Sequence, residues 1–111
     1  MNYTITYFDE ALEENVLDLP TTLLARYISL TDRMEQHGGN LGHPHTEAFG
    51  NGLFELRLKG AEGIARVFYC TLVGKRIVML HSFIKKTQKT PPSERRIAEA
   101  RMKEIKNGNT R

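Results

Sequence analysis

Three strand-like runs between residues 53 and 89 carry charged side chains inside otherwise apolar sequence. The runs are LFELRLK, IARVFY and RIVMLHSFIKKTQK, and they follow one another with only short turns between them. Arg57 and Arg66 lie inside the first two runs, and three lysines close the third. On neighbouring strands of one sheet, these cations would project onto a single surface. Because guanidinium and ammonium groups bind phosphate, the segment predicts a protein that works on nucleic acid.

The charge of the chain is divided unevenly between its two halves. The 111 residues carry a net charge of only +3. Residues 1–52 contain two arginines and eight acidic residues, a net charge of −6, whereas residues 53–111 contain fourteen basic and five acidic residues, a net charge of +9. This asymmetry indicates a polyanion as the partner of the basic half. A membrane surface is the rival partner, but the basic C-terminal segment lacks the large apolar face that membrane binding needs.

The acidic residues and histidines do not suggest a metal site. The three aspartates, Asp9, Asp18 and Asp32, all lie in the first third of the chain, so Mg²⁺-dependent nuclease chemistry is not expected. His43 and His45 have no cysteine or acid at convincing metal-ligand spacing. We interpret them as loop-shaping residues, with contact to RNA as a second option.

Cysteine usage and hydropathy indicate a cytoplasmic protein. Cys70 is the single cysteine of the sequence, which excludes an internal disulfide and fits a reducing compartment. It stands in a strand-like run, and we interpret it as a small core side chain. No apolar run approaches the roughly 18 residues that a membrane-spanning helix needs, so no membrane partner is expected.

Hydrophobic periodicity predicts one α+β domain over residues 1–111. The first half is expected to form a strand at 3–8, a helix at 10–17 capped by Asp9, a helix from Thr21 to the Gly38–Gly39 pair, and a loop at 40–52. Three strands follow, with turns at Gly60–Gly63 and Gly74–Lys75. The last helix is expected to start with Thr90 as N-cap and Pro91 as first residue and to end near Lys106. Residues 107–111 are expected to form a frayed tail.

The expected sheet is antiparallel, has about four strands, and carries the helices on one of its faces. In the strand that starts at Leu53, apolar side chains alternate with Glu55, Arg57 and Lys59, which share one face. The two following strands are more uniformly apolar, which predicts central strands covered on both faces. Helices on one face would leave the other face free for a ligand.

The chain resembles the RelE/ParE superfamily of toxins, and more closely its phage-derived, HigB-like branch. The segments that carry the resemblance are NLGHPHTEAFGNGLFELRLK, IARVFYCTLVGKRIVMLHSFIKKTQKTPPSE and the closing basic helix. The resemblance extends from the helix at Thr21 to about Ile105. It implies the small RelE-like fold with two N-terminal helices and one C-terminal helix.

The resemblance also implies a function and partners. Relatives are toxins of type II toxin–antitoxin modules that cleave messenger RNA on the translating ribosome, without a metal ion or organic cofactor. A small antitoxin neutralises them, in this branch usually one with a helix-turn-helix domain, and contact with operator DNA is expected through that antitoxin alone. Two alternatives remain open for this chain: a ParE-like poison of DNA gyrase, and a non-enzymatic module that binds nucleic acid.

The phosphate-binding residues are expected among the arginines of the strands. Arg66 is the first choice for the phosphate clamp, because its planar guanidinium binds phosphate bidentately and its position resembles that of the arginine with this role in the superfamily. Arg57 is the second clamp, on the adjacent strand, and Lys59 and Lys89 are expected to contact RNA beside it. A structural reading remains open for both arginines, as partners of a cross-strand acid for Arg57 and of an N-terminal acid for Arg66.

Metal-free RNA cleavage also needs groups that transfer protons. Lys85 and Lys86 lie where the superfamily places basic residues at the rim of its site, and either is a candidate base or acid if neighbouring cations lower its pKa. His81 is the conventional candidate for proton transfer, and Tyr69 is a candidate for stacking on a base or donating a proton. The competing interpretations are a hydrogen-bonded core histidine, a core tyrosine and a solvated lysine turn.

Overall fold

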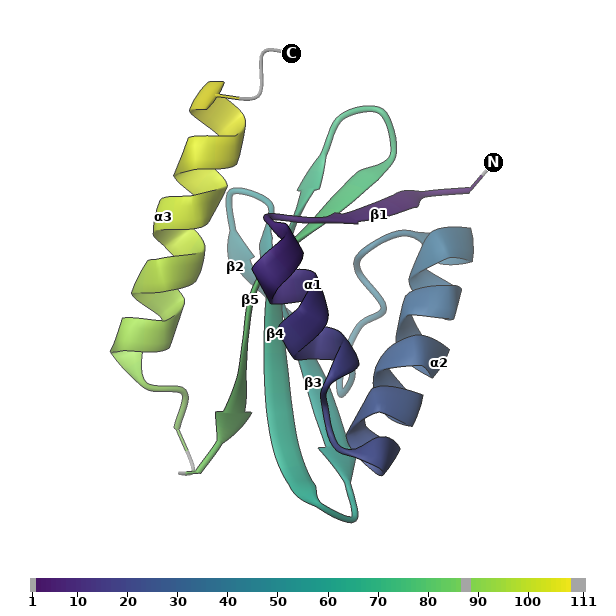
Figure 1. Cartoon of the computed structure of the whole chain (residues 1–111). Coiled ribbons are helices and arrows are strands. Elements are labelled where there is room, and N and C mark those ends of the chain that lie inside the picture. The colour runs from purple at the N-terminus through teal and green to yellow at the C-terminus, as the bar shows by residue number, and fades with distance from the viewer. Residues whose placement is uncertain (1, 87–88, 109–111) are drawn as a thin grey trace.

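The computed structural model describes residues 2–86 and 89–108 (Figure 1). The described chain forms five strands and three helices: β1 (Thr4–Tyr7), α1 (Glu10–Leu17), α2 (Thr21–His37), β2 (Thr46–Gly50), β3 (Leu53–Gly60), β4 (Gly63–Leu72), β5 (Arg76–Lys85) and α3 (Pro92–Gly108). The predicted turns between the last three strands are confirmed. None of these helices is long and apolar enough to cross a membrane.

The five strands form one mixed sheet in the order β1-β5-β4-β3-β2. Strands β2 to β5 pair antiparallel in sequence order, but β1 pairs in parallel with β5. The expected antiparallel sheet of about four strands is therefore corrected to a mixed sheet of five. The additional strand, β2, lies inside the segment 40–52 that the sequence predicted to be a loop. Strand β2 lies at the edge of the sheet and buries a single side chain, that of Thr46. Its sequence TEAFG therefore has no alternation of apolar and polar residues from which a strand could be predicted.

Both faces of the sheet are covered by helices. Alternate residues of β3, β4 and β5 enter two separate apolar clusters. One cluster joins the sheet to α1 and α2, and the other joins it to α3 through Ala98, Met102 and Ile105. The expectation that all helices pack on one face is wrong. The expectation that β4 and β5 are covered on both faces is confirmed, and it required a helix on each face.

The helix ends follow the predicted signals with two exceptions. Asp9 caps α1, because its Oδ1 accepts a hydrogen bond from Leu12 N at 2.9 Å. Helix α3 begins one residue later than expected, at Pro92, and the hydroxyl of Thr90 donates to a side chain of β3. The helix continues to Gly108, so two residues of the expected frayed tail are helical, and residues 109–111 lie outside the described part.

Candidate functional site

Helix α3 covers only part of its face of the sheet. The apolar cluster under α3 contains Leu53, at the start of β3, and Phe68, in the middle of β4. Farther along the same face, Arg57 lies directly opposite Arg66, and Lys59 lies opposite Ile64. On the other side of β4, Ile64 pairs with Lys85 of β5. The uncovered part of the face therefore carries two arginines and two lysines on three adjacent strands. The sequence predicted that one whole face of the sheet is free for a ligand, and this prediction holds only for the part that α3 leaves uncovered.

A buried carboxylate lies between the two arginines. Glu55, two residues before Arg57 on the same face of β3, is only 2% exposed. Its Oε1 lies 3.7 Å from Arg57 Nε and 3.6 Å from Arg66 Nε. Its Oε2 accepts a hydrogen bond of 2.9 Å from Thr90 Oγ1, just before α3. A single buried glutamate thus contacts two guanidinium groups and attaches the start of α3 to the sheet.

The hydrogen-bonding capacity of the arginines is only partly used within the described residues. Both Nε atoms are buried and make no hydrogen bond of good geometry there. Arg57 Nη2 forms a short ion pair with Glu47 of β2, a residue whose side chain is 45% exposed. Arg66 Nη1 donates to the carbonyl oxygen of Ala65 at 3.3 Å. The exposed Glu47 is the partner that a ligand anion can replace at lower cost, because Glu55 is enclosed by the fold.

Burial and mutual repulsion change the acidity of these cations. Burial is the largest cause that lowers the pKa of Arg66, followed by a rise due to Glu55 and a further decrease due to Arg57. Arginine remains charged at neutral pH despite such a shift. Burial also lowers the pKa of Lys85, and the charge of Arg66 adds to the decrease. The site therefore holds permanent positive charge beside a lysine that loses its proton more easily than an ordinary one.

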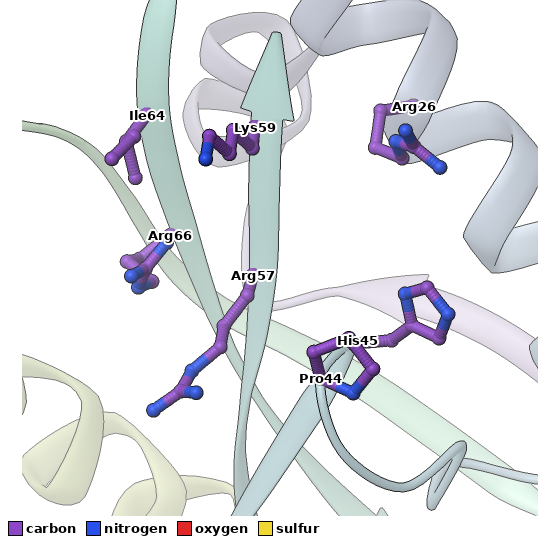
Figure 2. Close-up of a pocket in the computed structure, with 7 residues that line it drawn as sticks. All are labelled: Arg26, Pro44, His45, Arg57, Lys59, Ile64 and Arg66. Carbon is purple, nitrogen blue, oxygen red and sulfur yellow. The ribbon is translucent and has the colours of Figure 1, made fainter.

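The arginines open into a pocket of about 270 Å³ (Figure 2). We call it the arginine pocket. Figure 2 shows Arg57 and Arg66 projecting from neighbouring strands, with Arg26 on α2 and His45 on the loop before β2. The complete lining is Arg26, Pro44, His45, Arg57, Lys59, Ile64 and Arg66. Within the described residues, this lining has four cationic side chains and no carboxylate, so it favours an anion.

A second pocket of about 410 Å³ lies between the sheet and the start of α3. Arg57 belongs to its lining as well, so the two pockets meet at this side chain. The other walls of this pocket of about 410 Å³ include Glu47 and Phe49 of β2, Phe68 of β4 and Arg95 of α3. We call it the second pocket. Unlike the arginine pocket, it combines aromatic rings with acidic and basic groups.

Residues 14–103 match the family described as "Phage derived protein Gp49-like (DUF891)". The chain belongs to this family. Because the match extends from the second half of α1 through α2 and strands β2 to β5 into α3, the Gp49-like region contains every wall of both pockets. A search of curated proteins found no match.

The Gp49-like chain has the fold of RelE. It is similar to RelE in the archaeal RelE–RelB complex from Pyrococcus horikoshii OT3, with 18% sequence identity and a TM-score of 0.50, over 76% of this chain and 96% of that one. It is also similar to a double mutant of E. coli toxin RelE in the free state, with 13% identity and a TM-score of 0.53, over 95% of this chain and 99% of that one. The expected phage-derived family and the expected RelE-like fold are both confirmed.

The structure brings most of the predicted cations of the Gp49-like chain together. Arg57, Arg66 and Lys59 line the arginine pocket, and Lys85 and Lys89 line the second pocket with Arg57. Lys86 is exposed directly after β5 and lines neither pocket. The alternative interpretation of Arg57, as the partner of an acid on a neighbouring strand, also fits the structure, because Arg57 forms an ion pair with Glu47 of β2. For Arg66 the acid is Glu55 of β3 and not an N-terminal residue.

His81 lies beside α3, outside the linings of both pockets. Its Nε2 is 2.5 Å from Glu94 Oε1, and its ring stacks on Phe83 with centroids 6.0 Å apart. An irregularity in the β4–β5 ladder between Phe68 and Tyr69 turns His81 toward the helix. These contacts match the interpretation of His81 as a hydrogen-bonded histidine, which here attaches α3 to β5.

Tyr69 lies on the opposite face of the sheet from the arginines. It is fully buried in the cluster under α1 and α2, stacks on Phe54 with centroids 5.4 Å apart, and donates a short hydrogen bond to the carbonyl oxygen of Gly39. Burial raises its pKa, which opposes ionisation. A catalytic or base-stacking role for Tyr69 is therefore corrected to a core role, because the register of β4 directs it away from the pockets.

Sequence reasoning did not identify several residues of the site. Glu55 was recognised only as a neighbour of Arg57 on one face, and Arg26, Glu47 and Arg95 were not proposed at all. Arg26 and Arg95 lie on helices whose packing the sequence does not specify, and Glu47 lies in a strand predicted as loop. The signal that could have found Glu55 is its place at an apolar-flanked strand position, where a lone carboxylate needs a cationic partner.

Metal ligands are not clustered in the described part of the chain. No group of three or more His, Cys, Asp or Glu side chains there has a geometry that could hold a metal ion. The buried thiol of Cys70 lies under α3, and burial raises its pKa to about 11. The groups that the site offers are therefore guanidinium, ammonium, imidazole and carboxylate.

Proposed function

We propose that this Gp49-like protein is the toxin of a type II toxin–antitoxin module, an endoribonuclease that cuts messenger RNA on the translating ribosome without a metal ion. The observation that carries the proposal is the lining of the arginine pocket, which has three arginines and a lysine and no carboxylate among the described residues. A phosphodiester matches the charge and the forked hydrogen-bonding geometry of such a lining. The RelE fold and the HigB-like sequence segments are consistent with this function.

The proposed reaction uses the nucleophile that RNA itself supplies. A base removes the proton from a ribose 2′-hydroxyl, O2′ attacks the adjacent phosphorus, and the bond from phosphorus to the 5′-oxygen breaks. The products are a 2′,3′-cyclic phosphate and a 5′-hydroxyl, which takes its proton from an acid. Arg57 and Arg66 stabilise the negative charge that develops on the non-bridging oxygens. Arg57 exchanges its exposed partner Glu47 for the phosphate, while Glu55 keeps both guanidinium groups in place.

In this proposal Lys85 is the base and His45 is the acid. Lys85 suits the first role because its pKa is lowered by burial and by Arg66. His45 lines the arginine pocket, and imidazole is the commonest side chain for proton transfer. Lys85 and His45 line different pockets that meet at Arg57, so they would flank a phosphate bound there from two sides. An in-line displacement requires its base and its acid in such an arrangement.

We also propose a cognate antitoxin as the partner that neutralises this activity, with the helix-turn-helix domain expected from the HigB-like resemblance. Two surfaces of the chain suit it. An antitoxin segment with acidic side chains could cover the arginine pocket, or a basic segment could dock on the acidic surface formed by Glu10, Glu13 and Glu14 of α1. Gel filtration with the product of the adjacent gene should give a complex. Arg66→Ala should weaken the complex only if the antitoxin covers the arginine pocket.

Primer extension on messenger RNA in a reconstituted translation reaction tests the proposed cleavage. Wild-type protein should produce cuts that require translating ribosomes, and Arg66→Ala should abolish them. Arg33→Ala, at an exposed position of α2, is the matched control and should cut like the wild type. Intact messages with the folded wild-type protein would contradict the proposal. DNA damage signals in cells would then identify a gyrase poison, and harmless expression would identify a non-enzymatic binding module.

A further inference from the structure

The second pocket differs from the arginine pocket in the chemistry of its walls. Phe68 is fully buried behind it, and Phe49 lies against Phe68 with ring centroids 6.0 Å apart. The guanidinium carbon of Arg95 lies 4.4 Å from the centroid of the Phe49 ring. Flat aromatic and guanidinium surfaces stack on nucleobases, and the two carboxylates of this lining, Glu47 and Glu55, can accept hydrogen bonds, which the arginine pocket does not offer. The pocket therefore suits a planar group that carries both hydrogen-bond donors and acceptors.

The two pockets are joined at Arg57, which lines both. A phosphate held by Arg57 in the arginine pocket therefore brings one of its attached nucleosides to the mouth of the second pocket. Lys85 also lines the second pocket, so the nucleoside there would be the one whose 2′-hydroxyl loses its proton. A single nucleotide with its 3′-phosphate can thus occupy both pockets.

We propose that the second pocket binds the nucleobase on the 5′ side of the cleaved phosphate and selects guanine. This inference rests on the proposed function, because it assumes that the arginine pocket holds an RNA phosphate. It assigns Glu47 and Arg95 as specificity-determining residues and gives the cleavage a sequence preference.

Guanine fits because its two polar edges match the two charged groups of the pocket. The N1–H and N2 amino group of guanine form an adjacent pair of donors, and a carboxylate accepts from both at once. Glu47 offers such a carboxylate on a side chain that is 45% exposed, and its Oε1 contacts Arg57. The O6 and N7 atoms of guanine are acceptors for the two Nη groups of Arg95, whose Nε donates to Glu99 Oε2 at 3.1 Å.

Other bases match these two groups less completely. Adenine lacks the N1–H donor and carries an amino group where guanine has its O6 acceptor, so it would present a donor to Arg95. Inosine keeps N1–H, O6 and N7 but lacks the N2 amino group. It therefore removes a single hydrogen bond to Glu47 and leaves the rest of the base unchanged.

NMR titration of the full-length chain with nucleoside 3′-monophosphates tests this subsite without ribosomes. The three probes are guanosine, inosine and adenosine 3′-monophosphate. Wild-type protein should bind the guanosine compound roughly tenfold more tightly than the inosine compound, because one hydrogen bond to a charged acceptor is lost. The adenosine compound should bind more weakly still. Resonances of Phe49 and Arg95 should shift on titration.

Two variants separate the base contact from the phosphate contact. Glu47→Gln should reduce the difference between guanosine and inosine to less than about threefold, because a neutral amide replaces the carboxylate. Glu14→Gln, at an exposed position of α1, is the matched control and should keep the full difference. Arg66→Ala should weaken all three nucleotides by a similar factor, because it acts on the phosphate they share.

The outcomes distinguish the subsite from the proposed function. The guanine subsite would be overturned if the wild type bound the three nucleotides equally well, or if the preference survived in Glu47→Gln. In that case, a general loss of affinity in Arg66→Ala would still support the phosphate site. Nucleotide affinities that do not change in Arg66→Ala would instead contradict the phosphate site on which the proposed function depends. Absence of any shift at millimolar nucleotide would overturn both.

Discussion

Arg57 and Arg66 are direct cross-strand partners on β3 and β4, with the carboxylate of Glu55 within 4 Å of both Nε atoms. Like charges opposite each other destabilise a sheet, so this pairing needs a compensating charge. Glu55 supplies it from the same face of β3, under the start of α3. The fold therefore holds two guanidinium groups side by side at the open part of the sheet, where they can act on one anion together.

The central place of Glu55 predicts a large effect of Glu55→Gln on stability. The substitution removes the carboxylate beside Arg66 and leaves Arg57 with the exposed Glu47 alone, and breaking a buried ion pair costs about 3 kcal/mol. Urea unfolding monitored by circular dichroism measures this change. Glu47→Gln is the matched control and should cost less than about 1 kcal/mol, because its ion pair with Arg57 is exposed. Equal effects of the two variants would contradict the central role of Glu55.

Proton transfer by Lys85 predicts a pH dependence of cleavage. The neutral amine is the base, so the single-turnover rate should rise with pH through the pKa of Lys85. Because burial and Arg66 lower this pKa, the rise should occur below the pH at which an ordinary lysine loses its proton. Lys85→Ala should remove the rise, and added alkylamines should restore part of the rate. Lys103→Ala, exposed on α3, should leave the profile as in the wild type.

Tyr69 is predicted to affect stability and not cleavage. Tyr69→Phe removes the hydrogen bond to Gly39 O and should lower the free energy of unfolding by about 1 kcal/mol. Since burial raises the pKa of Tyr69, the folded state keeps its proton where the unfolded chain releases it. Stability should therefore fall as pH rises above about 10, the pKa of an exposed tyrosine, and Tyr69→Phe should reduce this alkaline loss. A slower cleavage rate per folded molecule would place Tyr69 in the reaction instead.

The contact between His81 and Glu94 is predicted to attach α3 to β5. His81→Gln and Glu94→Gln should each lower the melting temperature, and the double variant should lose less than the sum of the two, because both remove the same contact. Cleavage at the same fraction of folded protein should be retained by His81→Gln. A loss of cleavage without a loss of stability would return His81 to the candidates for proton transfer.

The sequence by itself determined every described helix and strand except β2, and it determined the side of β3 that carries charge. Strict alternation in LFELRLK fixed Glu55, Arg57 and Lys59 on one face, because the side-chain period of a strand is two residues. The glycine turns and the Asp9 cap fixed most element ends, because these signals act over a few neighbouring residues. The family resemblance rested on the same local segments.

The tertiary structure alone decided which charges meet. The register of β3 against β4 sets Arg57 opposite Arg66, and the register of β4 also directs Tyr69 into the opposite core. The parallel pairing of β1, the edge strand β2 and the position of α3 depend on contacts between distant segments, which local periodicity does not encode. Those contacts bring Glu47, Arg26 and Arg95 to the pockets, because a pocket forms only where separate elements pack together.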